Sequence, residues 1–396
     1  MRTARLGDCC EIVSGATPRR NVPQYWGNDV PWVTPKDLSN LETKILADAP
    51  EYISEAGYRS CSSKLMPTGS VLFSSRAPIG LVAIAGREMC TNQGFKSLVP
   101  GPDVHSDFLY YWLKANRDAI AERGNGATFK EISGKVMAGI EIPLPPLPEQ
   151  KRIAKILDAA DALRAKRRES LAQLDALLQS TFLEMFGDPV ENPKGWAVKS
   201  LGEIAARKPN NGIFRKNPEY LDNSQSGLPV VWVGELFRGN EIDVSSSRRL
   251  DVGEKDREKY GLEFGDILFC RSSLKLDGIA FNNLYLGETR EALFECHLIR
   301  LSPNQELVNP RFLNMLLRTS PLRAALKSKA KTATMTTIDQ KALMSVEVIV
   351  PPIDTQKQFS QILDSAEAHR SRLHSQVEEL SCLFNSLQAR AFNGRI

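Results

Sequence analysis

Few residues in this 396-residue chain have types and spacings that could carry out a reaction. Asn217-Pro218-Glu219-Tyr220 approaches the Asn/Asp-Pro-Pro-aromatic loop of an adenine methyltransferase, but Glu219 replaces the second proline and places a negative charge where a base must enter. We therefore interpret this segment as a turn. Gly124-Asn125-Gly126 has Phe129 where a dinucleotide-binding loop has its third glycine, so we interpret it as a flexible loop.

The residue spacings typical of nucleotide-binding and metal-binding sites are also absent from the sequence. The chain has no Walker sequence G-x-x-x-x-G-K-S/T, so it cannot be the ATP-driven part of a larger enzyme. Its four histidines (His105, His297, His369 and His374) have no metal-ligand spacing, and its seven cysteines include no C-x-x-C pair. We expect no catalytic, cofactor-binding or metal-binding residue, and predict that the chain is not an enzyme.

The composition is that of an ordinary globular protein with two to three domains, at 42% hydrophobic and 25% charged residues. A net charge of only +4 means that any nucleic-acid partner must be bound by clustered rather than numerous basic residues. The chain contains no apolar run of about 18 residues, so we expect no membrane partner. A cytoplasmic location with reduced thiols is expected.

One segment of the chain occurs twice. Ile140–Pro146 returns as Val346–Pro352, and Ile156–Asp158 returns as Ile362–Asp364, at a constant offset of 206 residues. This period is far longer than that of a solenoid, so it indicates two similar domains in tandem. Upstream matches, such as Leu6-Gly7-Asp8 with Leu201-Gly202-Glu203, have drifting offsets that indicate insertions within the domains.

Short β-branched and aromatic runs bounded by Gly, Pro or Asn predict strands in each domain, for example at Gly80–Ile84, Ile267–Phe269 and Leu298–Leu301. Phe108–Arg117 and Pro310–Arg318 are predicted to be short helices, and Pro310 suits the first turn of the second. This mixture is typical of an irregular α+β fold with long loops, where recognition residues usually lie.

Each domain is followed by a heptad pattern that predicts a helix of roughly 36 residues, or about 54 Å. The first stripe contains Ile153, Leu157, Ala160, Arg164, Arg167, Leu171, Leu174, Leu178 and Thr181, widened by Ile156, Leu163 and Leu177. The second contains Phe359, Leu363, Ala366, Arg370, Leu373, Val377, Leu380, Phe384 and Leu387. Neither helix is stable in water with its apolar stripe exposed, and the simplest partner for each helix is the other.

We therefore predict an α+β fold with two tandem, similar α/β domains separated by two long antiparallel coiled-coil helices related by a pseudo-twofold axis. The predicted parts are a first domain at 1–147, a first spacer helix at 148–187, a second domain at 188–353 and a second spacer helix at 354–396. Alternatively, the two stripes are buried in a helical bundle that holds unrelated domains, or in an interface between copies of the chain.

The strand, Pro-Pro and Glu-Gln-x-x-Ile junction, present twice, resembles the DNA specificity (S) subunit of Type I restriction-modification systems. Leu144–Ile153 is similar to a full copy of that family's motif, whereas Pro351–Phe359 departs from it, with Thr355 in place of the glutamate. Gly126–Ile132 and Thr332–Ile338 stand where the family has a Gly/Ser/Thr-rich turn. The resemblance covers essentially the whole chain and implies that both α/β domains are target-recognition domains.

The resemblance implies a non-catalytic subunit that binds a bipartite, asymmetric target in double-stranded DNA and docks two methylation (M) subunits, with restriction/translocation (R) subunits added for cleavage. S-adenosylmethionine, ATP and Mg are then expected on the partner subunits, and no cofactor on this chain. Two alternatives stay open: the recognition subunit of a related modification-only or split Type II system, and a coiled-coil scaffold that binds only proteins.

Within this family the side chains that contact DNA are expected in the loops, where basic residues meet phosphates and Arg or short polar residues meet base edges. In the first domain the candidates are Arg19, Arg20, Ser74, Ser75, Arg76, Asn92, Gln93, Thr128 and Lys130. In the second domain they are Arg215, Lys216, Arg271, Ser272, Ser273, Lys275, His297, Lys331, Thr334 and Thr336. The predicted partner-docking residues at the two junctions are Pro145, Pro146, Glu149, Gln150, Pro351, Pro352 and Gln356.

Overall fold

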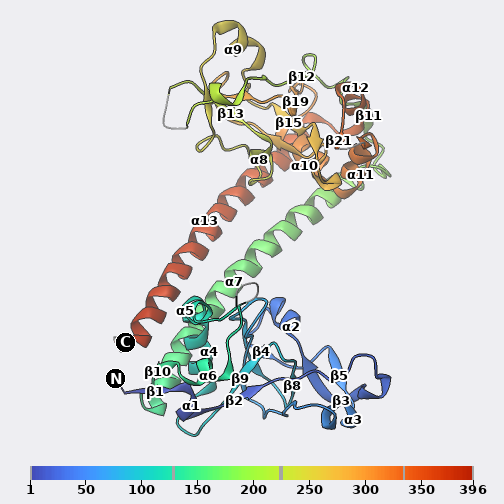
Figure 1. Ribbon diagram of the computed structural model, residues 1–396. Coiled ribbons are helices and arrows are strands. Elements are labelled where there is room, and N and C mark those ends of the chain that lie inside the picture. The colour runs from blue at the N-terminus through green and yellow to red at the C-terminus, as the bar shows by residue number, and fades with distance from the viewer. Residues whose placement is uncertain (1, 127–129, 223–225, 333–334, 395–396) are drawn as a thin grey trace. The chain divides into compact units, whose positions relative to one another are not determined.

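The protein is described by a computed structural model covering residues 2–126, 130–222, 226–332 and 335–394. The chain divides into two compact units, unit 1 with Met1–Glu169 and His374–Ile396, and unit 2 with Ser170–Leu373. Two long helices, α7 (Leu147–Phe186) and α13 (Ile353–Phe392), each give one end to unit 1 and the other end to unit 2 (Figure 1).

Unit 1 is an α+β domain. Its elements before α7 are β1 (Thr3–Arg5), α1 (Leu6–Cys9), β2 (Cys10–Ser14), η1 (Pro23–Tyr25), β3 (Trp26–Val33), α2 (Pro35–Ser39), β4 (Ile45–Leu46), β5 (Glu51–Ile53), α3 (Glu55–Arg59), β6 (Val71–Phe73), β7 (Val82–Ala85), β8 (Cys90–Thr91), β9 (Lys96–Pro100), α4 (Ser106–Ala115), α5 (Arg117–Glu122), α6 (Gly134–Ala138) and β10 (Glu141–Pro143). The main sheet has the order β2-β9-β6-β7-β4, and a second has the order β5-β3-β8. β1 pairs antiparallel with β10.

Unit 2 repeats this plan between the two long helices. Its elements are β11 (Ala197–Ser200), β12 (Asn210–Asn211), η2 (Asn217–Glu219), β13 (Leu228–Val231), α8 (Val233–Leu236), β14 (Arg249–Leu250), α9 (Glu254–Tyr260), β15 (Ile267–Cys270), β16 (Ser272–Ser273), η3 (Leu276–Gly278), β17 (Asn282–Leu284), β18 (Leu293–Phe294), β19 (Leu298–Leu301), α10 (Pro310–Arg318), α11 (Ser320–Ser328), β20 (Lys331–Thr332), β21 (Thr336–Thr337), α12 (Gln340–Met344) and β22 (Glu347–Val350). The sheets have the orders β12-β19-β15-β17, β14-β13-β18 and β16-β21-β20. β11 pairs antiparallel with β22, as β1 does with β10.

The registers confirm that the two units are versions of one domain. In unit 1, β3 is antiparallel to β5 and parallel to β8. In unit 2, β13 is antiparallel to β14 and parallel to β18. The central strands β6 and β15 are buried at every residue, which is typical of short apolar runs that are covered on both faces. Each such side chain contributes about 1.5–3 kcal/mol of burial free energy.

The predicted short helices are present. α10 spans Pro310–Arg318 as predicted, because the Asn309 side chain accepts hydrogen bonds from the backbone N–H groups of Arg311 at 3.0 Å and Phe312 at 3.2 Å and so caps the helix. α4 begins at Ser106, two residues before the predicted start. Asn217–Glu219, predicted to be a turn, forms the short η2.

The long helices pack in opposite directions within each unit. In unit 1, Ile153 and Leu157 from the start of α7 share a core with Phe384 and Ala391 from the end of α13. In unit 2, Phe182 from the end of α7 packs on Phe359 from the start of α13, with ring centroids 5.5 Å apart. The pairing is therefore antiparallel, as predicted.

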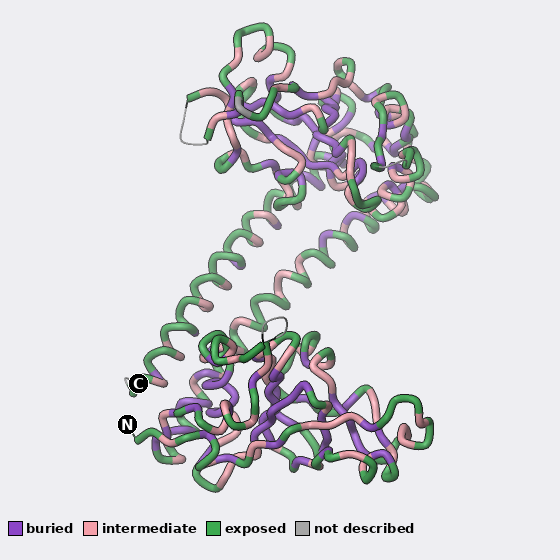
Figure 2. The backbone as a smooth tube through the Cα atoms, viewed as in Figure 1, coloured by how far each residue is buried: buried purple, intermediate pink, exposed green. Residues whose placement is uncertain are grey.

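The middle of α7 is more exposed than the stripe predicts (Figure 2). No residue of α7 between Ala160 and Leu178 is buried, although all of them are described. Leu163 and Leu177, which widen the predicted stripe, are 50% and 60% exposed. None of the helices in the described residues has the length and apolarity needed to cross a membrane.

Candidate nucleic-acid interface

Both units build the same turn between a strand of the small sheet and a strand of the main sheet. In unit 1, the side-chain oxygen of Asn92 accepts a hydrogen bond from the backbone N–H of Gly94 at 2.8 Å. In unit 2, a carboxylate oxygen of Glu295 accepts the corresponding bond from His297 at 2.9 Å. The carbonyl oxygens of Gly94 and His297 then accept bonds from Ser75 at 2.7 Å and Arg271 at 2.8 Å. The loop after β6 or β15 is thereby held against this turn.

A glycine brings a third loop to the same place in each unit. A Cβ atom on Gly15 would lie 2.0 Å from the carbonyl oxygen of Asn92, and one on Gly212 would lie 2.2 Å from that of Glu295. No other residue permits two backbones to approach so closely. The next residues complete the contact, because Ala16 N–H donates to Thr91 at 2.9 Å and Ile213 N–H donates to Phe294 at 2.8 Å.

In unit 1 this framework gathers side chains from separate segments. The hydroxyl of Thr17, after β2, donates to the side-chain oxygen of Gln93 in the turn. Arg76 and Lys96 lie 3.7 Å and 3.4 Å from the carboxylate of Glu131. Lys130 is exposed beside Glu131. Thr128, also predicted to contact DNA, lies outside the described residues.

Arg19 and Arg20 follow the same loop but differ in their contacts. The guanidinium of Arg20 lies 3.8 Å from the ring centroid of Trp26 and 4.8 Å from that of Trp32, and it pairs with Glu51. Arg19 is exposed, and its backbone carbonyl accepts hydrogen bonds from the indole N–H of Trp26 at 3.3 Å and the backbone N–H of Val22 at 3.2 Å. Arg20 thus holds part of the fold, while the Arg19 side chain faces solvent.

Ser74 and Ser75 are both fully buried. The Ser74 hydroxyl donates to the carbonyl of Pro78 at 2.7 Å and accepts from the backbone N–H of Leu81 at 2.8 Å, so it closes the loop. Contact with DNA is not open to either side chain in this conformation, because each is enclosed by the fold. Of the predicted Ser-Ser-Arg group, only Arg76 presents its side chain to solvent, at 37% exposure.

In unit 2 the loop after β15 carries Arg271, Ser272 and Ser273. Arg271 is exposed, and its Nη1 donates to the carbonyl of Cys296 at 3.4 Å. The Ser272 hydroxyl lies 2.7 Å from Nδ1 of His297, which joins the loop to the turn. The Ser273 hydroxyl donates to the carbonyl of Lys275 at 2.8 Å, and the Lys275 side chain is exposed.

The remaining predicted residues of unit 2 differ in exposure and in their contacts. β16 pairs with β21, and Thr336 in β21 is buried, with its hydroxyl 3.1 Å from that of Thr332. Lys331 in β20 and Lys216 before η2 are exposed. Arg215 is held by Asp256 at 2.6 Å and Glu219 at 3.6 Å. Thr334 lies outside the described residues.

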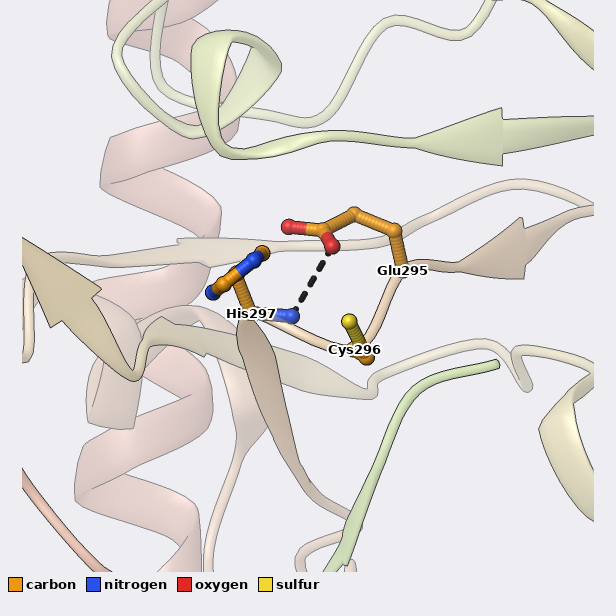
Figure 3. A group of neighbouring side chains, drawn as sticks. All are labelled: Glu295, Cys296 and His297. Carbon is orange, nitrogen blue, oxygen red and sulfur yellow. Dashed lines mark hydrogen bonds between the residues drawn. The ribbon is translucent and has the colours of Figure 1, made fainter. Parts of the chain in front are cut away.

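Glu295, Cys296 and His297 place a carboxylate, a thiol and an imidazole within 4.8 Å of one another (Figure 3). Burial raises the pKa of the Glu295 carboxyl, and burial also raises the pKa of the Cys296 thiol. The turn itself accounts for this grouping, because Asn92 makes the same bond in unit 1 with an amide oxygen. We therefore assign Glu295 to the turn rather than to a metal.

The doubled junctions are locked by two buried glutamines. Gln150 accepts a hydrogen bond from the backbone N–H of His105 and donates to the carbonyls of Asp103 and Pro145, each at 2.8 Å. Gln356 repeats the pattern with Asn309 at 2.8 Å, Leu307 at 3.1 Å and Pro351 at 2.7 Å. Each ties the start of a long helix to the loop before α4 or α10.

Both glutamines have 0% exposure, so their side chains serve the fold and cannot meet a partner in this conformation. Pro145 and Pro351 are also buried, whereas Pro146 and Pro352 are exposed. Glu149 is half-buried and pairs with Arg152 at 2.8 Å, a contact that lowers the pKa of the Glu149 carboxyl. The surface of each junction is therefore centred on the second proline.

Three residues of the interface, Glu131, Gly15 and Gly212, have roles that were not expected from the sequence. Glu131 balances Arg76 and Lys96, but an isolated acidic residue gives no signal of this role. Gly15 and Gly212 order the loops, and the only sequence signal is that a glycine follows a polar residue at the end of a short strand in both domains.

Comparisons with known proteins match this architecture. The profile of the Type I restriction modification DNA specificity domain matches residues 1–174 and 193–380. The chain therefore belongs to this family, and it contains two copies of the domain. It is a Type I restriction-modification specificity subunit by family, as the sequence predicted.

Individual relatives carry the same description. The MjaIX specificity subunit of Methanocaldococcus jannaschii is 35% identical over 69% of this chain and 66% of its own length. The EcoR124I/EcoR124II specificity subunit of Escherichia coli is 28% identical over 45% of each chain. The match thus spans less than two thirds of these two relatives.

Solved structures support the fold. A chain from a study of complex assembly and conformational transition of the type I R-M system superposes with a TM-score of 0.61, at 19% identity, over 100% of this chain and 98% of its own. The Type I S subunit from M. genitalium gives 0.56 at 16% identity, over 99% and 96%.

Proposed function

We propose that this chain is the non-catalytic subunit that selects the DNA sequence in a Type I restriction-modification complex. Unit 1 reads one half of a split, asymmetric site and unit 2 reads the other. Methylation subunits dock at the two equivalent junctions around Pro146 and Pro352, and restriction/translocation subunits join for cleavage. S-adenosylmethionine, ATP and Mg act on those partner chains, in the cytoplasm.

One observation carries this proposal: the same three-loop framework is built twice, and it presents different side chains each time. Thr17 in unit 1 corresponds to Phe214 in unit 2, and Gln93 corresponds to Cys296, because the surrounding backbone bonds are the same. A shared framework supports a common mode of approach to duplex DNA. Different side chains support two unlike half-sites, since base edges are distinguished by the groups that meet them.

Charge distribution supports the loops as the contact surface. Arg19, Lys130, Arg271, Lys275 and Lys331 are exposed, and none of them makes a salt bridge with another described residue. Exposed cationic side chains without an acidic partner can bind phosphates and release counterions, and an arginine among them can instead meet a base edge. They lie in the framework loops or in segments beside them.

The test is to co-express the chain with its methylation subunits and to map modified adenines for single variants. Arg76→Ala should relax or change one half of the recognised motif, and Arg271→Ala should change only the other half. Arg59→Ala and Arg372→Ala are matched controls, because both arginines are exposed and lie on helices outside the framework. Unchanged motifs and rates for Arg76→Ala and Arg271→Ala would remove the loops from the recognition surface.

A further inference from the structure

The loop after the central strand is four residues longer in unit 2 than in unit 1. In both units a backbone bond closes the loop, from Gly80 N–H to Ser74 at 3.0 Å and from Ala280 N–H to Cys270 at 2.8 Å. The loop therefore spans residues 75–79 in unit 1 and 271–279 in unit 2. The added residues form β16 and η3, which unit 1 does not have among its described residues.

The longer loop exposes apolar side chains beside the turn. Leu274 is 84% exposed and Leu276 is 54% exposed. Across from them, Phe237 is 48% exposed and stacks on Phe281, with ring centroids 4.6 Å apart, and Met335 is 38% exposed. Exposed apolar side chains that gather in one place mark a binding surface more often than isolated ones do.

Except for Leu276, these side chains line one open depression of about 720 Å³. Its apolar walls are Val233, Phe237, Leu274, Phe281 and Met335, and its polar lining includes Ser272, Lys275 and His297. The Ser272 hydroxyl and the His297 imidazole are already bonded to each other at 2.7 Å. The depression is thus a mainly apolar surface beside the predicted recognition residues.

Charge at its edges favours duplex DNA over an apolar protein segment as the occupant. Lys275 in the lining, Arg271 between β15 and β16, and Lys331 in β20 are exposed and make no salt bridge among the described residues. The acid in the lining, Asp277, is paired with Lys327 at 2.5 Å, and this bond lowers the pKa of the Asp277 carboxyl. Unpaired cations around an apolar centre suit phosphates around an apolar group of a base.

We propose that this depression receives the 5-methyl group of a thymine in the half-site read by unit 2, with Leu274 and Phe237 in contact with that methyl. The proposal rests on the function proposed above. The thymine methyl is the apolar group that the major groove presents at base edges. Unit 1 lacks the counterpart surface, because Ser39 occupies the position of Phe237, two residues after the acidic residue that caps the helix.

The test replaces single thymines of the mapped site by deoxyuridine, which removes only the methyl group. Binding of the assembled complex to each duplex is measured by fluorescence anisotropy. Burial of one methyl is worth roughly a fourfold change in Kd. We expect that loss at one or more thymines in one half-site and no loss in the other half.

The variant Leu274→Ala, alone and with Phe237→Ala, should bring the thymine-to-deoxyuridine ratio of Kd in that half to about one. Phe264→Ala is the matched control, because Phe264 is 52% exposed in unit 2 but does not line the depression. The control should keep the fourfold ratio. Circular dichroism of each variant establishes that it is folded.

Any one of three outcomes would overturn the proposal. The first is that the half-site changed by Leu274→Ala contains no thymine on either strand, and the second is that no deoxyuridine substitution weakens binding. The third is that the thymine-to-deoxyuridine ratio of Kd stays near fourfold in the double variant. Sequence-specific binding with any of these results leaves the proposed function intact and removes only the methyl contact. Failure of the complex to bind any duplex selectively would remove both.

Discussion

The buried glutamines at the two junctions lead to a direct prediction about stability. Gln150→Ala removes three hydrogen bonds and leaves one backbone N–H and two carbonyls of unit 1 without their partner. Gln356→Ala does the same in unit 2. If these side chains act inside the fold, each variant should weaken its own unit in the absence of any partner protein.

The size of the effect follows from the groups left unpaired. A buried polar group that loses its partner costs about 1–3 kcal/mol, and carbonyls with a second acceptor site cost less than N–H groups. We expect about 2–4 kcal/mol for each variant. For a unit of about 200 residues this corresponds to a fall in Tm of roughly 4–16 °C.

Thermal unfolding of the isolated chain, with hydrogen–deuterium exchange at 103–109 and 307–313, measures this effect and its location. Gln150→Ala should speed exchange in the first segment, and Gln356→Ala in the second. Gln361→Ala is the matched control, because Gln361 is exposed on α13. A Tm and exchange pattern equal to the parent for both variants, with loss only of partner binding, would refute the assignment.

Other predictions concern single side chains. Arg20→Ala should lower the free energy of unfolding of unit 1 by about 1 kcal/mol and change its tryptophan fluorescence, because the contacts with Trp26 and Trp32 are lost. The control variant Arg19→Ala should leave both quantities unchanged. Equal effects of the two variants would contradict the contacts seen for Arg20. Burial raises the pKa of the Cys90 thiol to about 11. At pH 8 only about one Cys90 thiol in a thousand is then ionised, so maleimide should modify the exposed Cys382 before Cys90, as measured by peptide mass spectrometry. Rapid labelling of Cys90 in the folded chain would be inconsistent with its burial. Lys331→Ala should reduce the slope of log K against log salt by about one for DNA binding by the complex; an unchanged slope would show that this ammonium group meets no phosphate.

Most of the fold could be predicted from periodic patterns in the sequence. The heptad stripes predicted α7 and α13, and the match of Leu298–Leu301 with β19 shows that a short apolar run between turn signals was enough. The antiparallel direction followed from the doubled order of elements. The extent of burial did not follow, because Leu163 and Leu177 satisfy the stripe in spacing yet remain exposed.

The loops were harder to predict because residue type does not reveal what the neighbouring backbone needs. Ser74 and Ser75 have the composition of a recognition loop, but their surroundings enclose them, and Ser74 satisfies the loop's own backbone. Gln150 resembles a surface motif residue, but it is buried and bonded to the loop carbonyl of Asp103, 47 residues away. Such contacts join segments that are distant in sequence, and no local pattern encodes them.

A map of methylated adenines, made for the chain co-expressed with its methylation subunits, tests most directly the claim that two unlike domains each read half of one site. The framework built twice with different side chains predicts a single motif with two unrelated halves separated by a fixed number of unread bases. A contiguous or palindromic motif would contradict it.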